Sequence, residues 1–173
     1  RAGSLYESDK QLGISHLIEH LMFTGTTNNN RDSRDAVYQE IDELTGGMEN
    51  GEDWICCTSF EHIPLGLRVM KEDAEHAMEL ISDILLRASL TYQKIESEKH
   101  VVFDEINYQH DNPQIRIWYE EFLSTVFKRY PLLKLTIGTE ETIRSFTSEE
   151  VRLFYEERFA PKALLVVGDI EFR

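Results

Sequence analysis

Residues 13–23 read Gly13-Ile14-Ser15-His16-Leu17-Ile18-Glu19-His20-Leu21-Met22-Phe23. The apolar residues of this stretch recur at intervals of three and four, which is the pattern of a helix that buries one face. Gly25 follows the last apolar position, and glycine commonly ends a helix. The pattern therefore predicts a helix over residues 13–23 with one face in the core.

Two histidines and a glutamate share one side of this predicted helix. His16 and His20 are four residues apart, which brings their Cβ atoms within about 5–6 Å of each other. Two imidazole nitrogens can then bind one Zn²⁺ at about 2.0–2.1 Å. Glu19 lies beside them, where it can take a proton from a water molecule that the metal has made more acidic. The order H-x-x-E-H reverses the H-E-x-x-H of zincins and is an inverzincin signature; the alternative is a chance pair of histidines on a solvated helix.

A catalytic zinc site of this kind needs a third protein ligand and one open position. Glu98 and Glu105 are seven residues apart on a second predicted helix, so they share one face. One of them could bind the metal while the other supports a ligand through a hydrogen bond. Spacing alone favours an ordinary solvated helix face, and it leaves Glu96 and Asp104 as rival candidates.

The rest of the pattern predicts more helices than strands. Helices are expected over residues 33–44, 73–88, 91–112, 113–127 and 147–159, and strands over residues 54–60, 67–70 and 163–167. Helices that cluster without alternating with strands favour an α+β fold, with helices packed on one face of a mainly antiparallel sheet. These strands are too few for a complete sheet. We therefore expect residues 1–173 to form a single, truncated domain that lacks its first strands.

Composition excludes some classes of partner. The chain carries 18 Lys and Arg against 32 Asp and Glu, a net charge of -14, which disfavours nucleic acid. No apolar run approaches the roughly 20 residues of a membrane span. No basic-then-apolar leader is visible from Arg1 onward, and the adjacent Cys56 and Cys57 are poorly placed to bond to each other. We therefore expect a cytoplasmic protein, or one of the mitochondrial matrix or periplasm if a leader was removed.

Four blocks in the same order resemble the insulinase/pitrilysin family of zinc peptidases, which includes the mitochondrial processing peptidase. The resemblance covers almost the whole chain. The blocks are Gly3-Ser4-x-x-Glu7 with Gly13-x-x-His16-Leu17-x-Glu19-His20-x-x-Phe23-x-Gly25-Thr26, then Glu96-x-Glu98-Lys99-x-Val101-Val102-x-x-Glu105-Ile106 with Asp111-x-Pro113, then Ile137-Gly138-Thr139-x-Glu141-x-Ile143, and finally Val166-Val167-Gly168-Asp169.

The resemblance implies a role for each candidate residue. His16, His20 and Glu105 would bind one Zn²⁺, Glu19 would be the catalytic base, and Glu98 would support the site from outside the ligand shell. It implies a zinc endopeptidase that cleaves peptides or processing segments, together with a second homologous domain or partner subunit. A non-catalytic structural subunit of the same family, or an inactive fragment that needs its second half, are the alternatives.

One block of the family leaves its register open. In the family, a Gly-Gly pair precedes an Asn-Ala strand whose backbone pairs with the substrate. Residues 46–47 match the glycines, but either Asn50-Gly51 stands for Asn-Ala or Ile55-Cys56 replaces it, in a frame set by Thr58-Ser59-x-Glu61-His62. The second register fits the following strand better, and it preserves main-chain pairing with a peptide.

Overall fold

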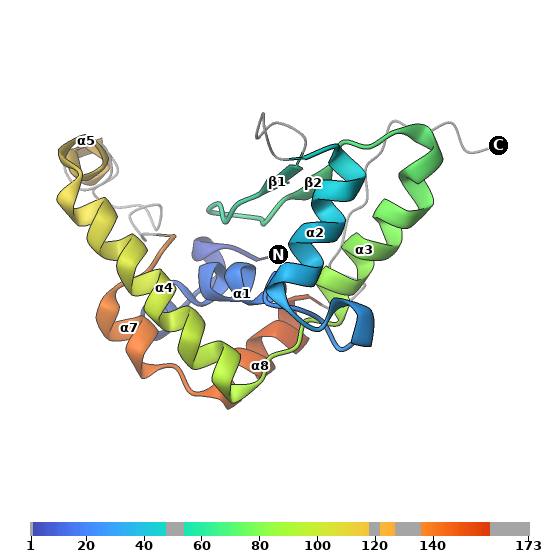
Figure 1. Ribbon diagram of the computed structural model, residues 1–173. Helices are drawn as coiled ribbons and strands as arrows, with labels where there is room; N and C mark the ends of the chain where they lie inside the picture. Colours follow the sequence, from blue (N-terminus) through green and yellow to red (C-terminus); the bar gives the residue numbers. More distant parts are fainter. Residues whose placement is uncertain (1, 48–53, 118–121, 127–135, 160–173) are drawn as a thin grey trace.

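The computed structural model describes residues 2–47, 54–117, 122–126 and 136–159 (Figure 1). Helices make up most of this part of the chain. The α-helices are α1 (Ile14–Met22), α2 (Arg34–Thr45), α3 (Ala74–Leu86), α4 (Tyr92–Asp111), α5 (Pro113–Arg116), α6 (Leu123–Val126), α7 (Glu140–Ser145) and α8 (Ser148–Arg158). Short 3₁₀ helices are η1 (Ser4–Tyr6), η2 (Asp9–Gln11), η3 (Asn29–Arg31) and η5 (Lys71–Asp73), and the strands are β1 (Trp54–Cys56) and β2 (Leu65–Leu67).

The two described strands form a small antiparallel sheet, in which Trp54 pairs with Leu67 and Cys56 with Leu65. A mostly helical chain with an antiparallel sheet confirms the expected fold class. The position of the second strand was predicted wrongly, because Pro64 and Gly66 indicated a turn before a strand over residues 67–70. Leu65 and Leu67 instead alternate onto the core side, and this packing outweighs the local turn signal.

Helices predicted over residues 13–23, 33–44, 73–88, 91–112 and 147–159 are all present. Of the helix expected over residues 113–127, the described parts are the short helices α5 and α6. The strand expected over residues 163–167 lies outside the described residues. Among the described helices, none is both long and apolar enough to cross a membrane.

Helix α1 lies in the middle of the structure, where it contacts α4 and α8 (Figure 1). Its apolar side chains are at most 1% exposed, and they are Ile14, Leu17, Ile18, Leu21 and Met22. Burying one such side chain stabilises a fold by about 1.5–3 kcal/mol. The fold therefore holds this helix firmly, and with it the two histidines and the glutamate that it carries.

A buried carboxylate fixes the start of α1. Gly13 precedes the helix with a positive φ of 87°, and a β-carbon there would lie 2.5 Å from the carbonyl oxygen of Ile137. The side chain of Glu7 accepts hydrogen bonds from the backbone N–H groups of Gly13 and Ser15, both at 2.9 Å. Glu7 is 3% exposed, and its negative charge suits the positive end of the helix dipole. The first block of the family resemblance thus anchors the helix that bears the histidines.

Buried ion pairs join η3 to α2 and α3. Arg31 donates to both carboxylate oxygens of Glu40, at 2.7 and 2.6 Å, and it also donates to Asp83. Asn28 donates to the same Asp83 oxygen at 2.9 Å. A two-pronged arginine–carboxylate pair fixes direction as well as distance. These contacts therefore set the position of α2 relative to α3.

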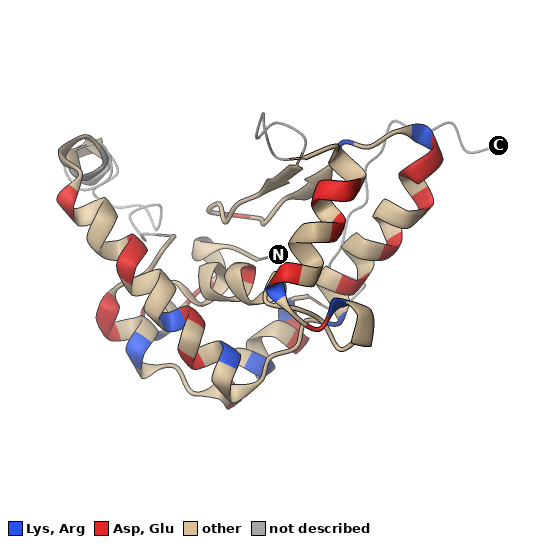
Figure 2. Cartoon of the chain, in the orientation of Figure 1, with Lys and Arg blue, Asp and Glu red and all other residues tan. Residues whose placement is uncertain are grey.

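Acidic residues outnumber basic ones along the outer helices. Figure 2 shows acidic positions along α2 and α3, whereas many of the basic positions in view lie where α4, α7 and α8 come together. Helices α2 and α3 together carry seven acidic side chains and one basic side chain, so their field would attract cationic groups.

Candidate metal centre

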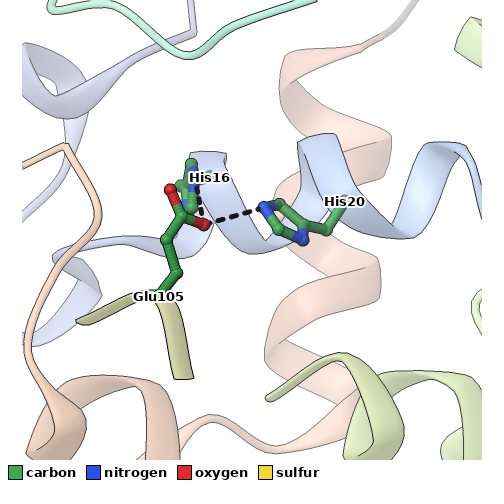
Figure 3. Close-up of side chains that lie close together, drawn as sticks. All are labelled: His16, His20 and Glu105. Atoms are coloured by element: carbon green, nitrogen blue, oxygen red, sulfur yellow. Dashed lines mark ion pairs between the residues drawn. The ribbon is translucent and has the colours of Figure 1, made fainter. Parts of the chain in front are cut away.

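Helices α1 and α4 bring together the three side chains that the resemblance singles out as ligands. His16 and His20 lie on α1, and Glu105 lies on α4, which packs against it. Each of the three offers one ligand atom, and these atoms all lie within 4.8 Å of one another. In Figure 3 the Glu105 carboxylate lies between the two imidazole rings. Glu105, which is 85 positions from His20 in the sequence and 89 from His16, thus joins both histidines in one cluster in space.

The dimensions of this cluster suit a zinc ion. Glu105 Oε2 lies 3.6 Å from His16 Nε2 and 3.4 Å from His20 Nε2. Ligand atoms at about 2.0–2.1 Å around a tetrahedral ion lie about 3.3–3.4 Å apart. Two imidazoles and one carboxylate are a common donor set of catalytic zinc sites, which keep a fourth position open. Donor types and spacing therefore both fit Zn²⁺.

The three side chains differ in how readily they give up a proton. Burial, with the nearby His20, lowers the pKa of His16 to about 4. Burial also disfavours a charge on His20, but the nearby carboxylates of Glu105 and Glu98 outweigh it and raise the pKa of His20 to about 9. The contact with His20 is in turn the main cause of the lowered pKa of Glu105. At neutral pH, His16 and Glu105 are ready to bind a cation, whereas His20 must first release a proton.

Glu98 contacts the Nδ1 side of the His20 ring, whereas Glu105 contacts the Nε2 side. Glu98 Oε2 is 3.5 Å from His20 Nδ1, and Glu98 Oε1 accepts a hydrogen bond of 2.5 Å from Arg34 Nη2. Burial works to raise the pKa of Glu98, but His20 and Arg34 together lower it. The carboxylate therefore stays ionised, placed to orient the imidazole as the resemblance implies.

The rival carboxylates of α4 are placed differently. Glu96 accepts a hydrogen bond of 2.7 Å from Lys99 Nζ, and Asp104 is exposed. Neither belongs to the cluster of possible metal ligands found among the described residues. The packing of α4 on α1 thus separates Glu105 from two candidates that sequence spacing could not exclude.

Glu19 is held by a residue that follows β1. Thr58 Oγ1 donates a hydrogen bond of 2.6 Å to Glu19 Oε2. Burial and the charge of Glu19 raise the pKa of Cys56, so its thiol stays neutral beside the carboxylate. The frame that runs through Ile55-Cys56 therefore lies next to the candidate base. The competing Asn50-Gly51 register lies outside the described residues.

Sequence reasoning missed two contacts of the site. Thr58 appeared only as a marker of the strand register, and Arg34 was not singled out at all. Both reach the site from segments whose distance to α1 depends on tertiary packing. For Thr58, the sequence offers only its place in the Thr58-Ser59-x-Glu61-His62 frame that follows β1. For Arg34, no sequence pattern points to a contact with the site.

Comparison with known proteins identifies the class to which this site belongs. Residues 1–140 match the insulinase family of peptidases, peptidase family M16. Because this match covers most of the chain, the chain belongs to that family.

Relatives and solved structures agree with this assignment. The chain is 33% identical over 159 residues to an uncharacterized zinc protease of Rickettsia felis, covering 92% of this chain and 36% of the relative. It is 27% identical over 165 residues to the mitochondrial-processing peptidase subunit beta of Dictyostelium discoideum, covering 95% and 33%. The crystal structure of the first half of the periplasmic protease PqqL from Escherichia coli shares the fold, with a TM-score of 0.77 and 23% identity over 94% of this chain and 34% of that one. The chain thus spans about a third of the length of these proteins.

Proposed function

We propose that the chain supplies the zinc-binding part of a metalloendopeptidase site. His16, His20 and Glu105 hold one Zn²⁺, and Glu19 is the general base. The observation that carries this proposal is that three ligand atoms, two from α1 and one from α4, lie within 4.8 Å of one another, with Glu19 on the same helix as the two histidines. Membership of a peptidase family and a zinc-protease relative support it.

Each residue of the site has a task in peptide hydrolysis. Bound zinc would supply Lewis-acid chemistry, because it polarises a carbonyl and lowers the pKa of a water molecule. Glu19 takes the proton of the attacking water and later delivers it to the leaving amine. Thr58 donates a hydrogen bond to Glu19 Oε2 and so fixes the orientation of this carboxylate.

A peptide substrate would bind along β1. This strand pairs with β2 on one side, and its other edge pairs with no further strand among the described residues. A peptide added there as an extra strand would need only main-chain hydrogen bonds. Since β1 leads directly to Thr58, such a peptide would run past Glu19.

We further propose that activity needs more protein than this chain. The chain spans 36% and 33% of two relatives, so a second homologous domain or a partner subunit would complete the site. Peptide cleavage measured with this chain alone, and again with the second half of the parent protein added, tests this directly. Equal cleavage in both mixtures would rule out the need for the second half.

Zinc binding should strengthen about tenfold for each pH unit between about pH 5 and pH 8. In this range His20 carries a proton, because its pKa is about 9, and zinc must displace it. His16 is already neutral, because its pKa is about 4, so only one proton is exchanged. Raising the pH removes the competing proton, and the gain should level off above about pH 9.

The measurement is a competition titration of the purified protein with a chelator whose zinc affinity is known at each pH. It also gives the stoichiometry, expected to be one zinc per chain. An affinity that does not change with pH would contradict the assigned ligands. A protein that binds no zinc at any pH would support the alternative of a non-catalytic subunit.

A further inference from the structure

Helix α2 begins against the same face of α4 that supports the candidate metal centre. Its first residue, Arg34, donates from Nη2 to Glu98 Oε1 at 2.5 Å. One turn earlier on α4, Lys94 Nζ donates to the backbone oxygen of Asp32 at 2.9 Å. Lys94 and Glu98 are four residues apart, so they lie on one face of α4. The start of α2 is therefore attached to α4 at two successive turns.

The contact continues from Glu98 to the imidazole of His20. Glu98 Oε2 lies 3.5 Å from His20 Nδ1, and His20 Nε2 lies 3.4 Å from Glu105 Oε2. The two ring nitrogens thus face different carboxylates. With the Glu98 carboxylate on the Nδ1 side, Nε2 would be the nitrogen that binds the metal, since a carboxylate partner at one ring nitrogen selects the role of the other.

The stability of α2 does not explain an arginine at this position. A cation at the first turn of a helix is unfavourable, because the N-terminus of the helix dipole is positive. Ser33 already caps the helix, accepting a hydrogen bond from the backbone N–H of Ala36 at 3.3 Å. The side chain of Arg34 is 41% exposed, whereas that of its partner Glu98 is 5% exposed. The geometry therefore assigns the arginine to the carboxylate and not to its own helix.

We propose that Arg34 is a positioning residue of the zinc site, which holds Glu98 in the orientation that directs His20 Nε2 toward the metal. This role rests on the zinc site of the proposed function. Without Arg34, a buried carboxylate oxygen loses its hydrogen-bond donor, and Glu98 is free to turn away from His20. Loss of a partner that orients a metal-binding histidine typically weakens metal binding by about 10–100-fold.

The test measures zinc affinity and needs no catalysis. Zinc dissociation constants are determined by chelator competition for the metal-free protein, for Arg34→Gln, for Glu98→Gln and for the double variant. We expect Arg34→Gln to weaken zinc binding at least tenfold. We expect the double variant to bind zinc no more weakly than Glu98→Gln, because the arginine acts only through that glutamate.

Arg144→Gln is the matched control. Arg144 pairs with Glu140 four residues away on α7 and lies over the ring of Phe103 on α4, so it also forms an arginine–glutamate contact, but neither contact involves Glu98 or the histidines. Its zinc affinity should equal that of the unmodified protein, and thermal unfolding of each metal-free variant should show that the fold is kept.

Each result has one meaning. Tight zinc binding that Arg34→Gln leaves unchanged overturns the role of Arg34 but not the proposed function. Losses that simply add in the double variant also overturn it, because Arg34 would then act independently of Glu98. An unmodified protein that binds no zinc overturns the proposed function, and this role with it.

Discussion

Replacing Glu19 with glutamine is expected to abolish peptide hydrolysis while zinc remains bound. Glutamine has the same shape and can still accept the hydrogen bond of Thr58, but it cannot take a proton from water. A general base contributes about 10²–10⁴-fold to a reaction rate. The ligands are untouched, so one zinc per chain should remain. The charge of Glu19 also helps to raise the pKa of His20, so its removal would if anything ease zinc binding.

The measurement combines cleavage of a fluorogenic peptide by the complete protein with its zinc content. Glu43→Gln is a suitable control, because Glu43 is exposed on α2 and contacts Gln39 on the same helix. This control should cleave at the rate of the unmodified protein. Normal cleavage by Glu19→Gln would mean that another group is the base. Loss of both cleavage and zinc would mean that Glu19 maintains the site and does not act only in proton transfer.

The helices were predictable because their signals are local. Ser33, Thr91 and Thr147 each accept a hydrogen bond from a backbone N–H three residues later, at 3.3, 3.3 and 3.2 Å. Such caps, with apolar spacing of three and four, require no knowledge of the rest of the chain. Helix α7 has the same kind of cap at Thr139, but it spans only Glu140–Ser145 and buries a single side chain, Ile143, so it shows no apolar spacing.

The site was only partly predictable, because it depends on which helix faces meet. The spacing of His16 and His20 within α1 is a local property, and it sufficed to suggest a metal. The proposed third ligand depends on how α4 packs on α1, which spacing cannot supply, so only family resemblance singles out Glu105. Arg34 lies on a third helix and matches no motif. Its contact with Glu98 became visible only when all three helices were placed together.

Replacing Glu105 with glutamine is expected to weaken zinc binding by a factor that grows with pH. Binding energies of about 10–16 kcal/mol for four-ligand zinc sites suggest about 2.5–4 kcal/mol for each ligand, or about two to three orders of magnitude in affinity. An opposing effect arises because Glu105 is the strongest of the groups that raise the pKa of His20 to about 9. Without that carboxylate the pKa of His20 falls, and its proton competes less with zinc. At pH 7 this would offset the loss of zinc affinity by up to about two orders of magnitude.

The loss of the ligand and the weaker competition from the His20 proton can be distinguished by their pH dependence. The protein is titrated at a series of pH values with zinc whose free concentration is set by a chelator. The lost ligand acts at every pH, whereas relief from the His20 proton fades as the pH approaches 9. The loss caused by Glu105→Gln should therefore be about tenfold near pH 7 and at least about a hundredfold near pH 9. Asp104→Asn is the matched control, since Asp104 is the exposed neighbour of Glu105 on α4. If both variants lowered zinc affinity equally, general loss of negative charge would explain the effect, and Glu105 would not be a ligand.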